Sequence, residues 1–166
     1  MLGNKLKISP LQFNMVVFSI IPLKKNNDLL MRRTKEYIQS LDIFYPDIRK
    51  WFDERVIPDF SNRSIILVLN SLREIHGIMI LKNTDEEKKI STIYLSPDAR
   101  HLGIGSSLIS LAIELLGHEK PLISIPHVCN KQYENLFKKF HFCCYASYPD
   151  YYKIGITEYS YNGYLI

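Results

Sequence analysis

The stretch "RHLGIGSS", residues 100–107, joins an alternating apolar run to a helical one. Its two glycines, Gly103 and Gly105, stand between basic residues and two hydroxyls. A turn that leads into a helix N-terminus offers free backbone N–H groups and a partial positive charge. Glycines let that backbone approach a bulky anion, and Arg100 adds a permanent cation. The composition suits a pyrophosphate, while a bare strand-to-helix turn, the commoner use of so short a glycine motif, stays open.

Two better-known phosphate-binding motifs do not match the residues of this stretch. A P-loop needs a lysine directly before its hydroxyl residue, and Ser106 has none. A dinucleotide fingerprint needs a third glycine where Leu108 stands, and an acidic residue about 20 positions further on. The stretch therefore belongs to neither class.

The sequence around this stretch predicts alternating strands and helices. Asn27 or Asp28 is a plausible N-cap for the first helix, and Gly117 is a natural stop for the helix that follows the glycines. Helices are expected at residues 28–41, 48–56, 104–116 and 133–140, and strands at 16–21, 64–70, 74–82, 88–95 and 121–126, with two more in the tyrosine-rich tail 141–163. The expected fold class is α/β, with an α+β mixed sheet of about seven strands and about four helices on both faces. We expect a single domain over residues 1–166, with residues 1–14 as a loosely ordered N-terminal extension.

The amino-acid composition and net charge limit the kinds of binding partner that we expect. Hydrophobic residues make up 46% and charged residues 23%, which is enough for a full core. The net charge of +4 is compatible with RNA or an anionic cofactor, but it is too mild to favour either. The apolar run at residues 15–23 is too short to cross a bilayer, so no membrane partner is expected. The five histidines lack metal-ligand spacing, so no metal site is expected.

The cysteines indicate a compartment. Their number is three, and two of them, Cys143 and Cys144, are adjacent, which makes a poor disulfide framework. We therefore interpret Cys129, Cys143 and Cys144 as free thiols in a reducing environment and predict a cytoplasmic protein.

In its wider context the opening stretch resembles a known family. The segment "IYLSPDARHLGIGSSLISLAIELL", residues 93–116, is similar to the acyl-CoA binding motif of the GNAT acetyltransferase superfamily. That motif reads Arg/Gln-x-x-Gly-x-Gly/Ala, and Arg100, Gly103 and Gly105 match it. The segment "EIHGIMIL" looks like the family's third strand with Gly77, and residues 121–142 look like its later strand, asparagine and helix. The resemblance covers the chain from about residue 16 to the C-terminus.

The resemblance implies transfer of an acetyl group from acetyl-CoA to a primary amine by direct attack. Leu95 would polarise the thioester carbonyl through its N–H group, and Ile93 and Leu95 would pair with the pantetheine arm like an added strand. Asn130 would hold the arm from the other side. A bulky residue at Gly105 is expected to fill the phosphate cradle and leave the fold intact. The residues implied for the pyrophosphate are Arg100, His101, Leu102, Gly103, Ile104, Gly105 and Ser106.

The sequence departs from the family at the proton-transfer positions. Many members carry a glutamate base on the strand before the motif, where this chain has Lys89. Glu86 and Glu87 precede that strand and are expected to be solvated. The usual tyrosine acid is replaced by Phe137. Tyr133 lies one helical turn earlier and is a candidate acid, with core packing as the alternative.

Other candidates near the acceptor side are weaker. His127 follows the short strand at residues 121–126 and is a possible base. Tyr151 and Tyr152 follow a Pro-Asp turn and are candidates for the acceptor site, with ordinary strand aromatics as the alternative. Trp51 is expected in the core or the cleft wall.

Three functions stay open. The first is an N-acetyltransferase that acts on a small molecule, a peptide terminus or a lysine, as a monomer or homodimer. The second is a toxin of this family that acetylates the amine of aminoacyl-tRNA, whose low pKa would make a base dispensable. The third is a non-catalytic acyl-CoA sensor or interaction module, for which the missing acid and base would be natural.

Overall fold

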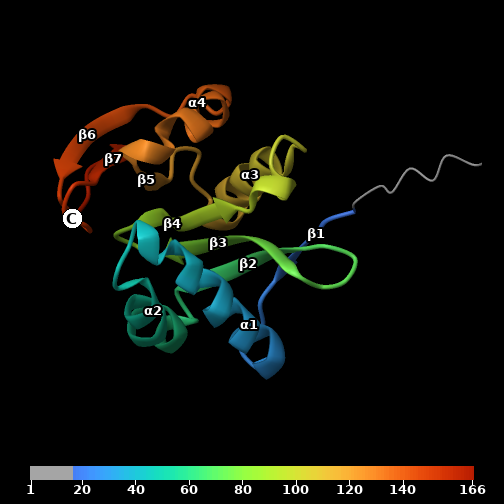
Figure 1. Cartoon of the computed structure of the whole chain (residues 1–166). Helices are drawn as coiled ribbons and strands as arrows, with labels where there is room; N and C mark the ends of the chain where they lie inside the picture. Colours follow the sequence, from blue (N-terminus) through green and yellow to red (C-terminus); the bar gives the residue numbers. More distant parts are fainter. Residues whose placement is uncertain (1–16) are drawn as a thin grey trace, which may run out of the picture.

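The computed structural model describes residues 17–166, which form a mixed seven-stranded sheet in the order β1-β2-β3-β4-β5-β7-β6 (Figure 1). The strands are Ser19–Pro22 (β1), Arg63–Leu69 (β2), Ile75–Asn83 (β3), Lys88–Leu95 (β4), Leu122–Pro126 (β5), Cys144–Pro149 (β6) and Thr157–Tyr161 (β7). The α-helices are Asp28–Gln39 (α1), Ile48–Trp51 (α2), Ile104–Leu116 (α3) and Asn130–Lys139 (α4). This confirms the expected fold class and element order. The expected N-terminal extension, residues 1–14, lies outside the described residues.

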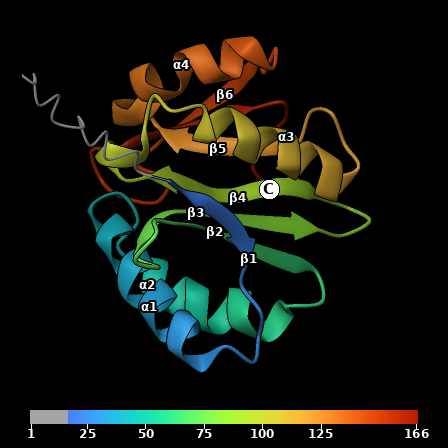
Figure 2. The same ribbon diagram turned by 90° about the vertical axis from the view of Figure 1, so that its right-hand side faces the viewer.

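The helices cover both faces of the sheet. Helices α1 and α2 lie on one face and α3 and α4 on the other (Figure 2). Strand β3 shows why, since Ile78 and Ile80 belong to the core under α1 and α2, whereas Met79 and Leu81 belong to the core under α3 and α4. A strand buried on both faces reads as a continuous apolar run, as the central strands do here.

Helix ends follow local sequence signals. The Asn27 side chain accepts a hydrogen bond from the Leu30 N–H at 3.1 Å and caps α1. Gly117 ends α3 with a φ of +59°, where glycine is favoured. The helix expected at residues 48–56 exists, but α2 continues as a π-helical turn over Phe52–Val56. The helical span was therefore predicted correctly and its hydrogen bonding was not.

Strands β4 and β5 separate after a short contact, and this split positions the functional site. They pair in parallel only at Lys89↔Leu122 and Ile90↔Ile123. The register of β4 against β3 shifts directly afterwards, so Ser91 is an extra residue, a β-bulge. A bulge bends its strand and increases the local twist. The second half of β4 consequently leaves β5, and the two strands diverge (Figure 1).

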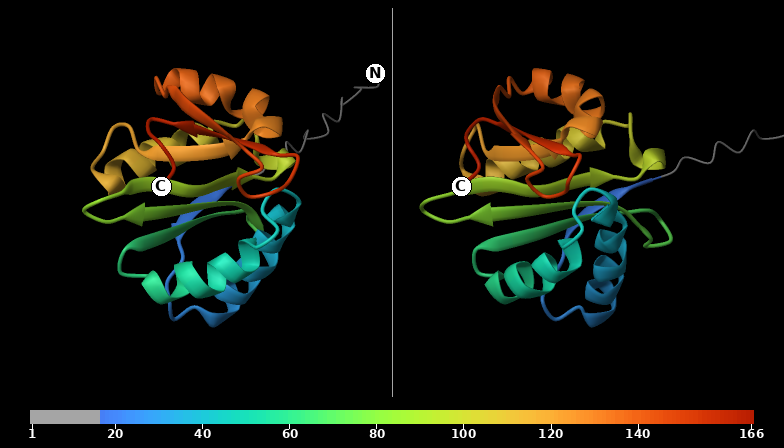
Figure 3. Two further views of the ribbon diagram at one scale, coloured as in Figure 1. Left: turned by 90° about the vertical axis from the view of Figure 1, so that its left-hand side faces the viewer. Right: turned by 60° about the vertical axis from the view of Figure 1, so that its left-hand side comes forward.

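The C-terminal hairpin completes the sheet beyond β5. Strands β6 and β7 pair in antiparallel fashion, and β7 also pairs with β5 (Figure 3). The last residues then return across the sheet toward β4 (Figure 3). Cys129, Cys143 and Cys144 are free thiols, as expected. Within residues 17–166, every helix falls short of the length and apolarity needed to span a membrane.

Candidate active site

The loop between β4 and α3 presents backbone donors to solvent. His101 and Gly103 adopt positive φ values of 60° and 79° and turn the chain into α3. The first hydrogen bond of the helix runs from the Ser107 N–H to the Gly103 carbonyl at 3.1 Å. The N–H groups of the first helical turn therefore have no acceptor within the helix. Among the described residues, no side chain caps this N-terminus, which leaves it open to an anion.

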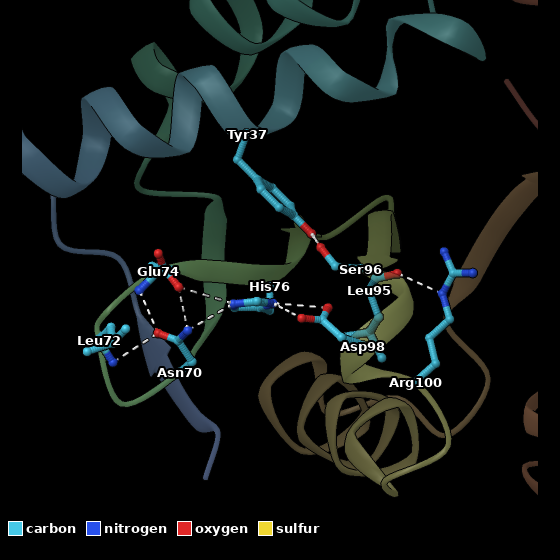
Figure 4. Close-up of polar contacts among 9 residues, drawn as sticks. All are labelled: Tyr37, Asn70, Leu72, Glu74, His76, Leu95, Ser96, Asp98 and Arg100. Atoms are coloured by element: carbon cyan, nitrogen blue, oxygen red, sulfur yellow. Dashed lines mark hydrogen bonds and ion pairs between the residues drawn. The ribbon is translucent and has the colours of Figure 1, made fainter. Parts of the chain in front are cut away.

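Side chains from α1 and β3 hold this loop in place (Figure 4). The hydroxyl groups of Tyr37 in α1 and Ser96 after β4 are hydrogen-bonded at 2.7 Å. The His76 ring in β3 contacts the Asp98 carboxylate at 3.0 Å through Nδ1 and the Asn70 amide at 3.1 Å through Nε2. These contacts hold the turn after β4 against the sheet, so the open helix end has a fixed place.

Two cations flank the loop in different ways. Arg100 lies over the Tyr94 ring, and its Nε donates to the Leu95 carbonyl at 2.9 Å, so it secures the end of β4 (Figure 4). Lys139 from α4 reaches across to the Ser106 hydroxyl at 3.1 Å. Sequence reasoning missed Lys139, because nothing in its neighbourhood connects it to residue 106.

The side of Gly105 that a side chain would occupy faces the protein interior. A Cβ built there would lie 3.3 Å from Leu136 Cδ2 of α4 and 3.8 Å from Leu95 Cδ1. The expectation that a bulky residue would fill the phosphate cradle and spare the fold is therefore wrong. Such a residue would push α3 away from α4. A Cβ on Gly103, in contrast, would meet nothing within 4 Å.

The split exposes backbone groups of β4. The Ser96 N–H donates to the His76 carbonyl in β3 at 2.7 Å. Because alternate residues of a strand direct their backbone groups to opposite edges, Leu95 and Ile93 direct theirs into the split. The Tyr133 hydroxyl donates to the Ile93 carbonyl at 2.7 Å, and burial raises the pKa of Tyr133 well above its ordinary value. The hydroxyl is therefore protonated at neutral pH, and the Ile93 carbonyl accepts its one proton.

The other residues implied on α4 are engaged within the protein. Asn130 begins the helix, and its Oδ1 accepts a hydrogen bond from the Tyr161 hydroxyl at 2.5 Å. Phe137 is buried, and its ring stacks on Tyr133 with centroids 5.6 Å apart. It fills the core where a tyrosine acid would stand in many family members. Leu102, in the loop, is 58% exposed.

A cavity of about 650 Å³ lies on the α2 side of the sheet next to the split. A smaller cavity of about 40 Å³ occupies the split itself, lined in part by Ile93 and Tyr133. Both cavities are lined by Tyr45, Ser91, Thr92 and Ser124, so one continues into the other. The large cavity is lined by Tyr45, Pro46, Asp47, Ile48, Trp51, Arg63, Lys82, Glu87, Lys89, Ser91, Thr92, Ser124, Tyr152, Glu158 and Ile166.

Glu158 is the buried carboxylate of the large cavity. Its side chain is almost wholly buried, and Oε1 accepts a hydrogen bond from the Tyr45 hydroxyl at 3.1 Å. Within residues 17–166, Oε2 has no hydrogen-bond partner. Burial raises the pKa of Glu158 to about 7, although Ser124, Tyr45 and the charge of Lys89 partly offset this effect. A carboxylate with this pKa can take a proton at neutral pH.

Sequence reasoning missed Glu158, although a signal was present. In "TEYSY" the alternation sends Tyr159 and Tyr161 to the α3–α4 core and Glu158 and Ser160 to the opposite face. A single acidic residue in an otherwise buried strand is a functional candidate. The sequence analysis proposed tyrosines of this tail as candidates and did not propose Glu158.

Of the other candidate residues, some line the large cavity and others do not. Glu87 was expected to be solvated, and this was wrong, since it lines the cavity, and its Oε2 lies 2.5 Å from Lys82 Nζ. Tyr152 and Trp51 also line the cavity. Tyr151 is as exposed as Tyr152 but is not among the residues that line the cavity. His127 accepts a hydrogen bond from the Thr157 N–H at 3.0 Å through Nδ1, which gives it a structural role.

This architecture defines a class of protein. A mixed sheet that splits beside an open helix N-terminus offers donors for phosphates and an unpaired strand edge for an extended arm. The sequence pattern of the Acetyltransferase (GNAT) family matches residues 29–142, most of the chain. The chain belongs to the GNAT acetyltransferase family and is thus an acyltransferase that uses acetyl-CoA.

Solved structures agree with the fold. A GNAT acetyltransferase from Bacillus cereus is 18% identical with a TM-score of 0.60, covering 87% of this chain and 95% of that one. A GNAT acetyltransferase from Elizabethkingia anophelis with acetyl-CoA bound is 16% identical with a TM-score of 0.59, covering 86% and 96%. Spermidine N-acetyltransferase from Vibrio cholerae, in complex with CoA and spermine, is 11% identical with a TM-score of 0.56, covering 86% and 94%. No curated protein matches the chain significantly in sequence.

Proposed function

We propose that this protein is an N-acetyltransferase that moves an acetyl group from acetyl-CoA to a primary amine by direct attack. The observation that carries the proposal is Glu158, a buried carboxylate with a pKa of about 7 in a cavity that continues into the split of the sheet. The Elizabethkingia protein binds acetyl-CoA, and the Vibrio protein is named for an amine acceptor. Both support the pair of substrates.

The residues on the loop and β4 fit acetyl-CoA. The open N-terminus of α3, from Ile104 to Ser106, would donate to the pyrophosphate together with the backbone of residues 101–103, and Lys139 would add a cation nearby. The edge of β4 would pair with the pantetheine arm at Ile93 and Leu95. The Leu95 N–H would donate to the carbonyl oxygen where negative charge develops during attack.

Glu158 would serve as the general base in place of the glutamate that β4 lacks. In the sheet it pairs with Pro126, three residues beyond Ile123, which is opposite Ile90. Glu158 is therefore about level with Ile93 along the parallel strands, near the end of β4 where the thioester would lie. The carboxylate takes a proton from the ammonium group of the acceptor, and the neutral nitrogen can then attack the carbonyl carbon.

Tyr133 would serve as the acid. When the C–N bond forms and the C–S bond breaks, the departing thiolate needs a proton, which the Tyr133 hydroxyl would supply. Burial raises the pKa of Tyr133 and so makes this proton harder to release, and the negative charge that develops on sulfur must drive the transfer. The tyrosine regains its proton from solvent, and the proton held by Glu158 leaves the same way. After attack the nitrogen still carries two hydrogens, and it loses one of them to solvent as the amide forms. The buried carboxylate and the buried hydroxyl thus serve two of the three proton transfers, the first from the ammonium group and the one to the thiolate.

The test measures release of the CoA thiol from acetyl-CoA with a panel of amines that includes an aminoacyl-tRNA. We expect Glu158→Gln to lower kcat by ~100-fold, and Tyr133→Phe to lower it by ~10-fold, with acetyl-CoA affinity retained in both. Glu114→Gln, an exposed position on α3, is the matched control and should keep wild-type activity.

Two outcomes would overturn the proposal. Acetyl-CoA that binds tightly but releases no thiol with any amine would favour a non-catalytic sensor. Full activity of Glu158→Gln, restricted to aminoacyl-tRNA, would favour an enzyme whose acceptor arrives already deprotonated.

A further inference from the structure

Three cations stand side by side across the sheet. The register pairs Arg63 of β2 with Lys82 of β3, and Lys82 with Lys89 of β4. All three line the large cavity. Like charges directly opposite one another on neighbouring strands destabilise a sheet. A row of this kind needs anions close by.

Among the described residues, two carboxylates lie within ion-pair distance of this row. Glu87 lies 2.5 Å from Lys82 Nζ and 3.8 Å from Lys89 Nζ, and so it serves two cations. Asp59, which is one-third exposed, lies 3.4 Å from Arg63 Nε. Glu87 is thus shared by two cations, while the other carboxylates that line the cavity, Asp47 and Glu158, lie beyond ion-pair distance of the row.

Arg63 is built to face a ligand. Its side chain is nine-tenths buried, and the guanidinium lies 5.7 Å from the centre of the Trp51 ring. Nη1 reaches the Ser91 hydroxyl at a long 3.4 Å, and the buried Nε faces the Asp59 carboxylate at 3.4 Å without the geometry of a hydrogen bond. A buried donor that lacks a well-aligned hydrogen bond costs free energy, which an anionic ligand in the cavity would recover through the guanidinium.

The charge at the opposite end of the cavity has the other sign. Lys89 is level with Leu122, whereas Glu158 is level with Pro126, four residues along β5. At about 3.3 Å per residue, the two backbone levels are roughly 13 Å apart, and the long side chains shorten this gap. Asp47 lies exposed among the lining residues and leaves this polarity intact. The cavity is basic at one end and has a proton acceptor at the other.

We propose that the acetyl acceptor carries a carboxylate in addition to its amine, and that the row Arg63–Lys82–Lys89 binds this carboxylate while the amine lies beside Glu158. The acceptor class is an amino acid or a short peptide with a free C-terminus. A polyamine is disfavoured, because it would bring positive charge to three cations. This inference rests on the proposed acetyltransferase function.

The first test compares matched amines. Glycylglycine and L-lysine are assayed against glycylglycinamide and L-lysinamide, which differ from them only at the carboxylate, and against cadaverine. We expect kcat/KM to be at least ~10-fold higher for the carboxylates, because hydrogen bonds to charged groups discriminate by this amount. Arg63→Met and Lys89→Met should each abolish the preference by raising KM for the carboxylates alone. Lys88→Met, which removes a neighbouring charge outside the cavity lining, should preserve it.

The second test needs no turnover. Calorimetry with glutarate, an unreactive dicarboxylate, should detect binding to the wild-type protein and to Lys88→Met, and binding weakened by ~10-fold in Arg63→Met and Lys89→Met. Circular dichroism checks that each variant is folded.

The two proposals fail in different ways. If the amides or cadaverine are acetylated as well as the carboxylates, or if glutarate does not bind, the carboxylate site is overturned and the acetyltransferase proposal stands. If glutarate binds as expected and no amine is acetylated, the proposed function fails and the anion site stands.

Discussion

The buried Glu158 lowers the stability of the folded protein when its carboxylate is ionised. Burial raises its pKa from an ordinary 4.5 to about 7, so the folded protein holds this proton more tightly than the unfolded chain does. Below pH 4.5 the group is protonated in both states and contributes nothing. As the pH rises toward 7, the unfolded state ionises first and stability falls. Above pH 7 the full penalty applies, about 3 kcal/mol by the size of the shift.

This cost predicts how the Glu158→Gln variant unfolds. An amide of the same shape carries no charge, so at pH 8 the variant should be more stable than the wild type by about 2 kcal/mol. The difference should shrink to near zero at pH 4. Urea unfolding at the two pH values measures it, and the wild-type kcat/KM should rise with pH through an apparent pKa near 7.

An equal change in stability at both pH values would contradict the assignment of this pKa to Glu158. Glu134→Gln is the control, because Glu134 is exposed and its pKa is lowered through its contact with Lys138. Its stability should not follow the pattern of Glu158→Gln.

At the residue scale the sequence grouped the proposed phosphate-binding residues, but it did not bring together the residues of the cavity. Residues 100–106 share one loop, so a local motif could bring them together. Glu158 meets Tyr45 across 113 positions of sequence, and Lys139 meets Ser106 across 33. Such contacts depend on strand order and register, which one sequence does not display. The absence of the usual base at Lys89 was visible in the sequence, whereas the proximity of Glu158 on another strand was not.

The loop between β4 and α3 is an element under backbone strain. His101 and Gly103 both have positive φ, which costs a residue with a Cβ about 1 kcal/mol, and only Gly103 is free of that cost. The strain turns the first-turn N–H groups of α3 outward. The His76–Asp98 contact and the Tyr37–Ser96 hydrogen bond hold the turn in this conformation.

We predict that two alanine substitutions in this loop differ in their effect on acetyl-CoA binding. Gly103→Ala should lower stability by about 1 kcal/mol and weaken acetyl-CoA binding, because alanine resists the φ of 79°. Gly105→Ala should bind acetyl-CoA normally, since its Cβ would meet the ends of two flexible side chains, Leu136 at 3.3 Å and Leu95 at 3.8 Å. Calorimetric titration with acetyl-CoA checks both. Equal affinities in the two variants would contradict a conformational role for Gly103.

At the scale of elements, periodicity predicted existence well and internal geometry poorly. The apolar spacing of Ile48, Phe52 and Val56 serves an α-helix and a π-turn alike, so the widened turn at Phe52–Val56 was not visible. The bulge at Ser91 was equally hidden, since "KKISTIYL" reads as a regular strand. Yet the bulge is what separates β4 from β5.

The molecule as a whole consists of two sheet segments joined along a short seam. Strands β1–β4 form one segment and β5–β7 the other, and the backbone pairs of Lys89 and Ile90 with β5 join them. Beyond this seam the segments are held by side chains, among them Tyr133 against Ile93 and Tyr45 against Glu158. The cavities follow the line along which the segments separate.

A ligand that pairs with β4 should protect its free edge. We predict that the amides of Ile93 and Leu95 exchange hydrogen rapidly in the protein without acetyl-CoA and at least ~10-fold more slowly at saturating acetyl-CoA. The amide of Ile80, in a strand paired on both sides, should change little by comparison. Hydrogen exchange followed by NMR measures all three, and unchanged rates at Ile93 and Leu95 would exclude strand-like pairing.

The overall architecture was predictable because its causes are local. Alternating and helical periodicities, with breakers such as Pro97 and Gly117, specified the order of elements, and that order permits few topologies. The large cavity was not predictable, since its lining comes from α2, five strands and the C-terminal Ile166. Only the assembled sheet brings those segments together.

The free edge of β4 also has a consequence for solubility. An unpaired strand is a template on which another polypeptide can add, and this is a common route to aggregation. Here the carbonyl of Ile93 is bonded by Tyr133 and that of Leu95 by Arg100. An intruding strand would therefore find both acceptors taken by side chains of the protein itself. These two side-chain contacts along the edge of β4 thus guard the chain against self-association.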